Sequence, residues 1–199
     1  MPLNHKHKLL FVHIPKNAGT SIEYYFGMMK PKLFYGTNSI TEGKVLFSPQ
    51  HLTPPLLKKK LGDKIYGEYF KFAFVRHPNE RVISEFFWQQ RINQIPKNMN
   101  FKKWVFSYYK KIDTDHKLPQ HHYVYDKDGK IMIDFLGKVE NINEDFDRML
   151  KKINYKTNNK LPKRNVNSSS YNLNMMDEDI KNFIYEIYKN DFKYFNYGK

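Results

Sequence analysis

The stretch LLFVHIPKNAGTSIEYYF, from Leu9 to Phe26, predicts a buried strand, a polar turn and an amphipathic helix, in that order. The apolar run Leu9 to Ile14 is short, partly β-branched or aromatic, and stopped by Pro15, all of which favour a strand. We expect Thr20 or Ser21 to cap the helix, because apolar residues recur at helical spacing after them. The helix would pack through the face formed by Ile22, Tyr25, Phe26 and Met29.

The polar turn between this strand and this helix has the composition of a phosphate-binding loop. A strand that leads into a helix aims several backbone N–H groups, and the positive end of the helix dipole, at one point that attracts an anion. Lys16 adds a full charge beside that point, and Gly19 allows a close approach of the backbone. The hydroxyls of Thr20 and Ser21 are further donors. The turn therefore predicts a phosphate site, with a capped helix beside an unrelated lysine as the alternative.

The length and composition of the chain favour one α/β domain. We expect residues 1–199 to form a single domain around one sizeable core. The chain has no cysteine, which excludes disulfides and thiolate metal sites. No segment has the length and apolarity of a membrane span, and a strand that begins by about Leu9 leaves no room for a signal peptide. We therefore expect a cytoplasmic protein.

The formal charge of +14 suggests nucleic-acid binding as one possible function. Only five of the 34 basic residues are arginine, however, and the chain is also rich in Asn, Tyr and Ile. This bias is typical of an AT-rich genome, in which lysine is the default surface residue. We interpret most of the charge as solvated surface and expect no dedicated nucleic-acid partner, although the positive field would attract a polyanionic substrate.

A second strand and helix repeat the plan of the first. The run FKFAFV, Phe70 to Val75, predicts a strand that ends at Arg76 and His77, and Pro78 suits the first turn of a helix that continues to about Gln90. Two such units predict a parallel sheet with crossover helices, whose ligand lies beyond the carboxyl ends of the strands. Both polar turns should therefore meet at that edge of the sheet.

The rest of the chain gives coarser predictions. We expect helices over residues 101–112 and 143–153, and a hairpin over 123–137 that turns at Asp128 and Gly129. A final helix should begin after Asp177, which would cap it. Residues 93–100 predict a loop, and residues 154–172 predict either a flexible insertion or a lid over a ligand.

A metal-dependent nucleotide kinase is disfavoured by the order of residues in both turns. The pattern G-x-x-x-x-G-K-[ST] is absent, since Lys16 precedes the single glycine of its turn. Such kinases also need a carboxylate to hold Mg²⁺ at the end of a neighbouring strand, where this chain has Arg76. The sequence predicts instead a second anion site around Arg76, with Arg81 and Ser84 three residues apart on the following helix.

The segments HIPKNAGTS and FVRHPNERVISEFF together resemble the sulfotransferases that use 3′-phosphoadenosine 5′-phosphosulfate, PAPS, and specifically the carbohydrate group with the heparan and chondroitin enzymes, sulfotransferase family 2. The segments FLGKVENINEDFDRML and LPKRNVNSSS are similar to later parts of that family. The resemblance implies a P-loop-like three-layer α/β fold with a central parallel sheet flanked by helices. It also implies PAPS as the co-substrate, no metal, and a hydroxyl acceptor on a sugar or glycan.

The resemblance also assigns roles to residues of the first turn. Lys16 would bind the 5′-phosphate and stabilise charge on the bridging oxygen as the sulfuryl group leaves. Donors to that phosphate would come from Ala18, Gly19, Thr20 and Ser21. Asn17 stands where the family usually has threonine, a small polar replacement that we expect to be tolerated.

The second motif supplies the 3′-phosphate ligands that the resemblance implies. Arg76 and Ser84 match them, whereas Arg81 would either bind the same phosphate or tie the helix to the sheet. Ser168 would close over the adenosine end of the donor. His51 lies between the two motifs, where this group often places its catalytic histidine, and we predict that it is the general base, with simple capping of a helix as the alternative.

Two further predictions concern the other histidines and the class of function. We expect His13 to make a structural hydrogen bond, and we do not expect a zinc site at His116, His121 and His122, because matching Cys or Glu spacing is absent. The alternative to a sulfotransferase is a nucleotide- or polyanion-binding module without turnover.

Overall fold

The structure is a computed structural model, and it describes residues 2–28, 39–162 and 173–199. Its strands are β1 (Leu3–Asn4), β2 (Leu9–Phe11), β3 (Ile40–Glu42), β4 (Val45–Phe47), β5 (Phe70–Val75) and β6 (Phe135–Lys138). Its α-helices are α1 (Gly19–Tyr25), α2 (Pro54–Glu68), α3 (Pro78–Arg91), α4 (Phe101–Tyr108), α5 (Ile142–Lys152) and α6 (Glu178–Tyr194). Short 3₁₀ helices are η2 (Gln120–Tyr123), η3 (Val139–Asn141) and η4 (Leu173–Met175).

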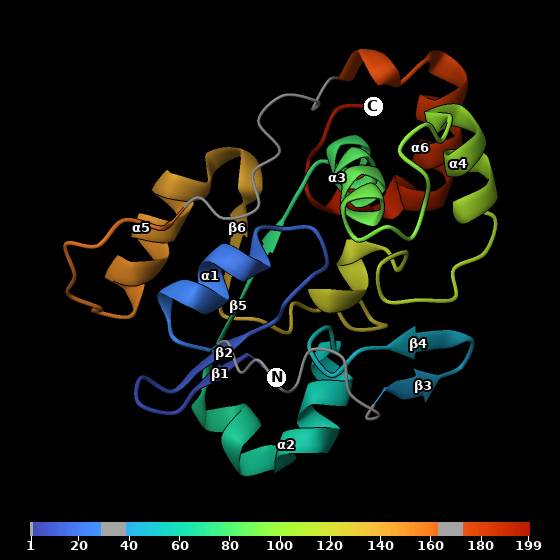
Figure 1. Cartoon of the computed structure of the whole chain (residues 1–199). Helices are drawn as coiled ribbons and strands as arrows, with labels where there is room; N and C mark the ends of the chain where they lie inside the picture. The colour runs from blue at the N-terminus through green and yellow to red at the C-terminus, as the bar shows by residue number, and fades with distance from the viewer. Residues whose placement is uncertain (1, 29–38, 163–172) are drawn as a thin grey trace.

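A four-stranded sheet in the order β1-β2-β5-β6 forms the centre of the fold. β2 pairs with β5 in parallel, with Phe11 opposite Phe72, and β5 pairs with β6 in parallel, with Phe72 opposite Phe135. β1 adds an antiparallel edge. The predicted mixed α/β architecture, a central parallel sheet flanked by helices, is confirmed (Figure 1).

The two faces of the sheet carry separate apolar layers, because side chains alternate along each strand. Phe11, Phe72 and Phe74 pack against α1 and α5, which contribute residues such as Ile22 and Phe146. The opposite face packs against α2 and the segment around η2, through a cluster that includes Leu10, Val12, Ala73, Val75, Leu56, Leu57 and Tyr123. This layering buries both faces, which explains the nearly continuous apolar sequence of β5.

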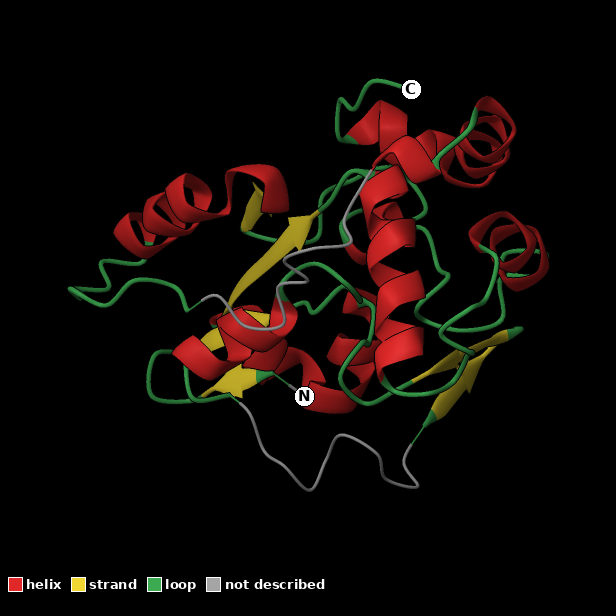
Figure 2. Ribbon diagram, turned by 45° about the horizontal axis from the view of Figure 1, so that its top comes forward, coloured by secondary structure: helices red, strands yellow, loops and turns green. Residues whose placement is uncertain are grey.

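A third apolar cluster joins α3, α4 and α6. Figure 2 shows the helices, in red, around the strands of the sheet, in yellow. Its buried members include Phe86 of α3, Trp104 of α4 and Tyr188 of α6. Because α3 begins directly after β5, this cluster fixes the helix that carries the second polar turn.

The predicted hairpin over residues 123–137 is confirmed around its turn, where the Asp126 amide donates to Lys130 and the Met132 amide to Val124, but it is wrong in its extent. One isolated bridge, Tyr125 to Ile131, spans the turn at Gly129, and the second arm of the expected hairpin ends instead in β6. β6 joins β5 in parallel, because Phe135 and Leu136 find apolar partners in the central sheet. The turn residues Asp128 and Gly129 therefore reverse the chain locally, and the segment after them continues into β6 of the central sheet.

The boundaries of the predicted helices need smaller corrections. Thr20 and Ser21 do not cap α1, because the helix begins at Gly19 and its N-cap is Ala18, with φ of 61° and no side-chain cap hydrogen bond. The final helix is capped as predicted, since Asp177 accepts a hydrogen bond from the Ile180 amide. α3 begins at Pro78 as predicted.

Other differences concern the extent of elements. The first strand ends at Phe11, and α4 ends at Tyr108. The hairpin of β3 and β4 and most of α2 were not predicted. Within the described ranges, no helix has both the length and the apolar character needed to cross a bilayer.

Close packing between β5 and β6 predicts that Gly137→Ala destabilises the protein. A Cβ at Gly137 would overlap the ring of Phe74, which is buried. We expect the free energy of unfolding, measured in urea, to fall by about 1–3 kcal/mol. The control is Gly67→Ala on α2, where nothing lies near the added Cβ and stability should be unchanged or slightly higher. Equal stability of both variants would contradict the described packing.

Candidate active site

The first polar turn has a backbone shape that suits an anion. Lys16 and Ala18 both have left-handed backbones, with φ of 70° and 61°, which non-glycine residues adopt only at a cost. Successive amides in such alternating conformations form a concave group of N–H donors. The turn lies a few residues after Phe11, the last residue of β2, so the sheet places this concavity beyond the carboxyl end of the strand.

The position of Gly19 requires glycine, because a neighbouring side chain fills the space where a Cβ would lie. A Cβ at Gly19 would overlap the imidazole of His13. His13 is buried, and its Nδ1 lies 2.7 Å from Glu23 Oε1, which is the expected structural hydrogen bond. Burial alone would raise the pKa of Glu23, but the hydrogen bond from His13 and the nearby Gln50 amide hold that pKa below its usual value.

The Lys16 side chain is partly buried next to an aromatic ring and several charges. Its Nζ lies 4.8 Å from the centroid of the Trp88 ring, within cation–π distance. Burial lowers the pKa of Lys16 to about 8, against the opposing effect of the Glu85 carboxylate, and Arg91 and Arg76 lower it further. Lys16 is therefore a cation at neutral pH that is closer to losing its proton than an exposed lysine.

The two polar turns meet at the edge of the sheet, as the parallel strands predict. Arg76 follows β5 directly, and its Nη1 donates to the backbone oxygen of Lys16 over 3.3 Å. Its Nε donates to Glu80 Oε2, also over 3.3 Å. The arrangement places two basic side chains, one from each turn, around one edge.

Arg81 makes the contacts of a residue that ties the helix to the sheet. It is 2% exposed, and its guanidinium donates to three backbone oxygens, those of Pro15, His116 and Leu118. Ser84 lies one turn further along α3 and is half-buried. Of the first turn's hydroxyl residues, Thr20 is half-buried and Ser21 is buried. Ser168 lies outside the described residues.

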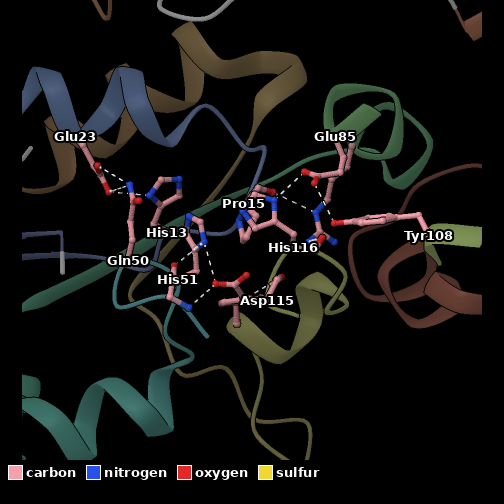
Figure 3. Close-up of polar contacts among 12 residues, drawn as sticks. His13, Pro15, Glu23, Gln50, His51, Glu85, Tyr108, Asp115 and His116 are labelled. Atoms are coloured by element: carbon pink, nitrogen blue, oxygen red, sulfur yellow. Dashed lines mark hydrogen bonds and ion pairs between the residues drawn. The ribbon is translucent and has the colours of Figure 1, made fainter. Parts of the chain in front are cut away.

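His51 is buried beside an aspartate that the sequence analysis did not single out. The Nδ1 of His51 lies 3.1 Å from Asp115 Oδ2 and 3.1 Å from Ser48 Oγ (Figure 3). Burial lowers the pKa of His51 to about 4, although the hydrogen bond with Asp115 opposes this. Burial would raise the pKa of Asp115, but its bond with His51 holds it far below the usual value. A neutral imidazole beside an ionised carboxylate carries its proton on Nδ1, so Nε2 is left as an acceptor.

Three histidines form a row, and each has its own buried carboxylate (Figure 3). The ring centroids of His13 and His51 are 4.7 Å apart, and those of His51 and His116 are 5.1 Å apart. The partners, in the same order, are Glu23, Asp115 and Glu85. Each carboxylate fixes the Nδ1 side of its ring, so the row is held in one orientation.

Glu85 connects this row to Lys16. Its carboxylate lies 2.8 Å from His116 Nδ1 and accepts hydrogen bonds from Gln89 and Tyr108. Burial would raise the pKa of Glu85, but His116 and Lys16 lower it to about 2. Glu85 is therefore a buried anion that favours the charged form of Lys16.

Among the described residues, the set His51, Asp115 and His116 has the composition of a metal site, with potential ligand atoms within 4.8 Å of one another. The Nδ1 atoms of His51 and His116 are engaged by Asp115 and Glu85, respectively. His121 pairs separately with Asp191. The prediction that the protein uses no metal stays a prediction.

Glu140 connects the second polar turn to the C-terminal segment. Its carboxylate accepts hydrogen bonds from the His77 amide and the Tyr197 hydroxyl. His77 in turn caps α3, since its side chain accepts from the Asn79 amide. Glu140 therefore holds the second polar turn through His77, a residue of that turn.

Comparisons with known proteins identify the family of the chain. An uncharacterized protein of Archaeoglobus fulgidus is 29% identical to the chain over 98 residues, which are 49% of this chain and 78% of that protein. No solved structure gives a significant match. The model of the sulfotransferase family matches residues 2–198, which is nearly the whole sequence. The chain therefore belongs to the sulfotransferase family.

Proposed function

We propose that the protein transfers a sulfuryl group from PAPS to a hydroxyl of a sugar or glycan by in-line displacement, with residues 1–199 as one catalytic domain. The observation that carries the proposal is the contact between the two polar turns, in which Arg76 donates to the Lys16 backbone. Two such basic turns at one sheet edge suit a donor that carries one phosphate on the 5′ and another on the 3′ position of its ribose. The family match supports sulfuryl transfer as the reaction class.

The first turn would hold the 5′ end of the donor. Its left-handed residues, Lys16 and Ala18, shape the concave backbone. The amides of Ala18, Gly19 and Thr20 are the proposed donors for the 5′-phosphate, since the Ser21 amide already donates to the Ala18 oxygen. The Lys16 ammonium, which lies over the Trp88 ring in the ligand-free structure, would neutralise charge on the oxygen from which the sulfuryl group departs.

The second turn would hold the 3′-phosphate. Arg76 supplies the charge, and Ser84 supplies a hydroxyl from α3. Arg81 acts by holding the turns in place, since backbone oxygens accept its hydrogen bonds. A sulfuryl group carries less charge than a phosphoryl group, so lysine, arginine and amide donors suffice without a divalent ion.

His51 would take the proton of the attacking hydroxyl. Its neutral Nε2 is the acceptor atom, because Asp115 engages Nδ1. The imidazolium that forms would be stabilised by the ionised Asp115, in the same way that a carboxylate supports the histidine of a hydrolase triad. Burial keeps the free imidazole neutral across the neutral pH range.

Removing either basic residue should abolish tight donor binding. We expect Lys16→Ala and Arg76→Ala each to weaken binding of adenosine 3′,5′-bisphosphate about 10- to 100-fold, because each removes a charged hydrogen-bond donor to phosphate. Isothermal titration calorimetry measures this, and Arg148→Ala, an exposed arginine of α5, is the matched control. Wild-type protein that binds adenosine 5′-phosphate as tightly as the bisphosphate would contradict the two-phosphate site.

Removing the histidine should separate binding from transfer. We expect His51→Ala to bind the bisphosphate normally and to lose transfer about 10²- to 10⁴-fold, with Asp115→Asn intermediate. Transfer is followed with labelled PAPS and a panel of sugars in the presence of EDTA, and His7→Ala, an exposed histidine near the N-terminus, is the control. Normal turnover by His51→Ala would reject it as the base. Donor binding by wild-type protein without turnover on any acceptor would favour the binding-module alternative.

Donor affinity should fall as the pH rises through about 8, because Lys16 loses its proton near that value. Above it, the dissociation constant of the bisphosphate should rise by up to about tenfold per pH unit, until it reaches the roughly 10- to 100-fold loss expected for Lys16→Ala. The Lys16→Arg variant keeps its charge and should show no such rise, even if its affinity is lower throughout. A wild-type affinity that stays constant from neutral pH to well above this value would show that the charge of Lys16 does not contribute.

A further inference from the structure

A fully buried glutamine joins the two polar turns. Gln120 Oε1 accepts hydrogen bonds from the Arg76 amide over 2.9 Å and from Asn17 Nδ2 over 2.7 Å. Gln120 Nε2 donates to the Arg76 backbone oxygen over 2.7 Å. Both polar atoms of the side chain are thereby used on Arg76 and Asn17, with 0% of the residue exposed.

These contacts lie where β2 and β5 separate. The Val12 amide donates to the Phe72 oxygen in the manner of a strand pair. Two residues further along β5, the Phe74 oxygen accepts instead from the side chain of Asn17, over 2.8 Å. From this point onward, the side-chain amides of Asn17 and Gln120 replace the backbone ladder that would otherwise hold the strands together.

Gln120 is itself fixed from the opposite side. The carboxylate of Asp191 on α6 is fully buried, and its Oδ2 accepts from the Gln120 amide over 2.8 Å. Its Oδ1 accepts from the His121 amide over 2.9 Å and lies 2.8 Å from His121 Nδ1. A charged acceptor with three partners gives η2 a rigid anchor on the last helix.

We propose that Gln120 is a positioning residue that sets the distance between the two phosphate-binding turns, and thereby the preference for a ligand phosphorylated at both the 5′ and the 3′ position. This inference rests on the proposed function. Gln120 acts through Arg76 and Asn17 and needs no contact with the ligand. A ligand gains affinity from both turns only when the distance between the turns matches the distance between its two phosphates. If binding must first order the turns, the entropy cost of ordering them reduces that gain in affinity.

The test compares two ligands on one variant and a matched control. We expect Gln120→Met to reduce the preference for adenosine 3′,5′-bisphosphate over adenosine 5′-phosphate about tenfold, as measured by calorimetry, while binding of the monophosphate changes less. The control is Gln90→Met, which also removes a buried amide that donates to backbone oxygens, those of Pro96 and Lys97. That variant should lose stability and keep the preference.

A second variant and a measurement on the wild type keep the test decisive if Gln120→Met fails to fold. Gln120→Glu retains the acceptor for the Arg76 amide and loses the donor to its oxygen, so we expect an intermediate preference. In ligand-free wild-type protein, hydrogen exchange followed by NMR should show the Arg76 amide protected, because Gln120 accepts it.

The outcomes separate the two proposals. Folded Gln120 variants that keep the wild-type preference, or rapid exchange of the Arg76 amide in ligand-free protein, would overturn the role of Gln120. A wild-type protein with no preference for the bisphosphate, together with a protected Arg76 amide, would overturn the proposed function. The hydrogen bonds from Gln120 to Arg76 and Asn17 would then be structural contacts only.

Discussion

The parallel pairing of β2 with β5 is the constraint on which the candidate site depends. Parallel neighbours end at the same edge of a sheet, so the turn after Phe11 and the turn after Val75 are brought together although about 60 residues separate them in sequence. The strands must then separate to admit a ligand, and their backbone groups need new partners there. Side chains of Asn17, Gln120 and Arg81 provide these partners from inside the protein.

Burial of charge is the second organising feature. Glu23, Asp115 and Glu85 are all nearly inaccessible to water, which is costly for a carboxylate unless it is paired and hydrogen-bonded. Each is paired with an imidazole of the row His13, His51 and His116 and accepts further hydrogen bonds. The result is a fixed electrostatic environment around the edge of the sheet, in which Lys16 and His51 have lowered pKa values.

The sequence predicted the parts of this arrangement that leave local signals. Phe70 to Val75 is a continuous apolar run bounded by polar residues, and it forms β5 with those limits. Lys16 and Arg76 were found because each is the first charged residue after the apolar run of a predicted strand.

The rest could not be predicted because its signals are not local. β6 follows a turn and alternates weakly, so the sequence favoured a hairpin, whereas its partner β5 lies about 60 residues earlier. Asp115 and Gln120 belong to a polar stretch without periodicity, and their partners lie 64 and 44 residues away. In the sequence, Glu85 cannot be told apart from a solvent-exposed glutamate of a helix. Only the tertiary structure shows that it is buried.

The anchor at Asp191 has a consequence for the order in which the chain becomes functional during synthesis. The first polar turn emerges from the ribosome early, yet the glutamine that joins it to the second turn, Gln120, is anchored on a carboxylate near the end of α6. Contacts of such large sequence separation form late, since most of the chain must be present to make them. A nascent or truncated chain that lacks α6 would hold the residues for anion binding without their final spacing, so ligand recognition would be acquired only as the fold is completed.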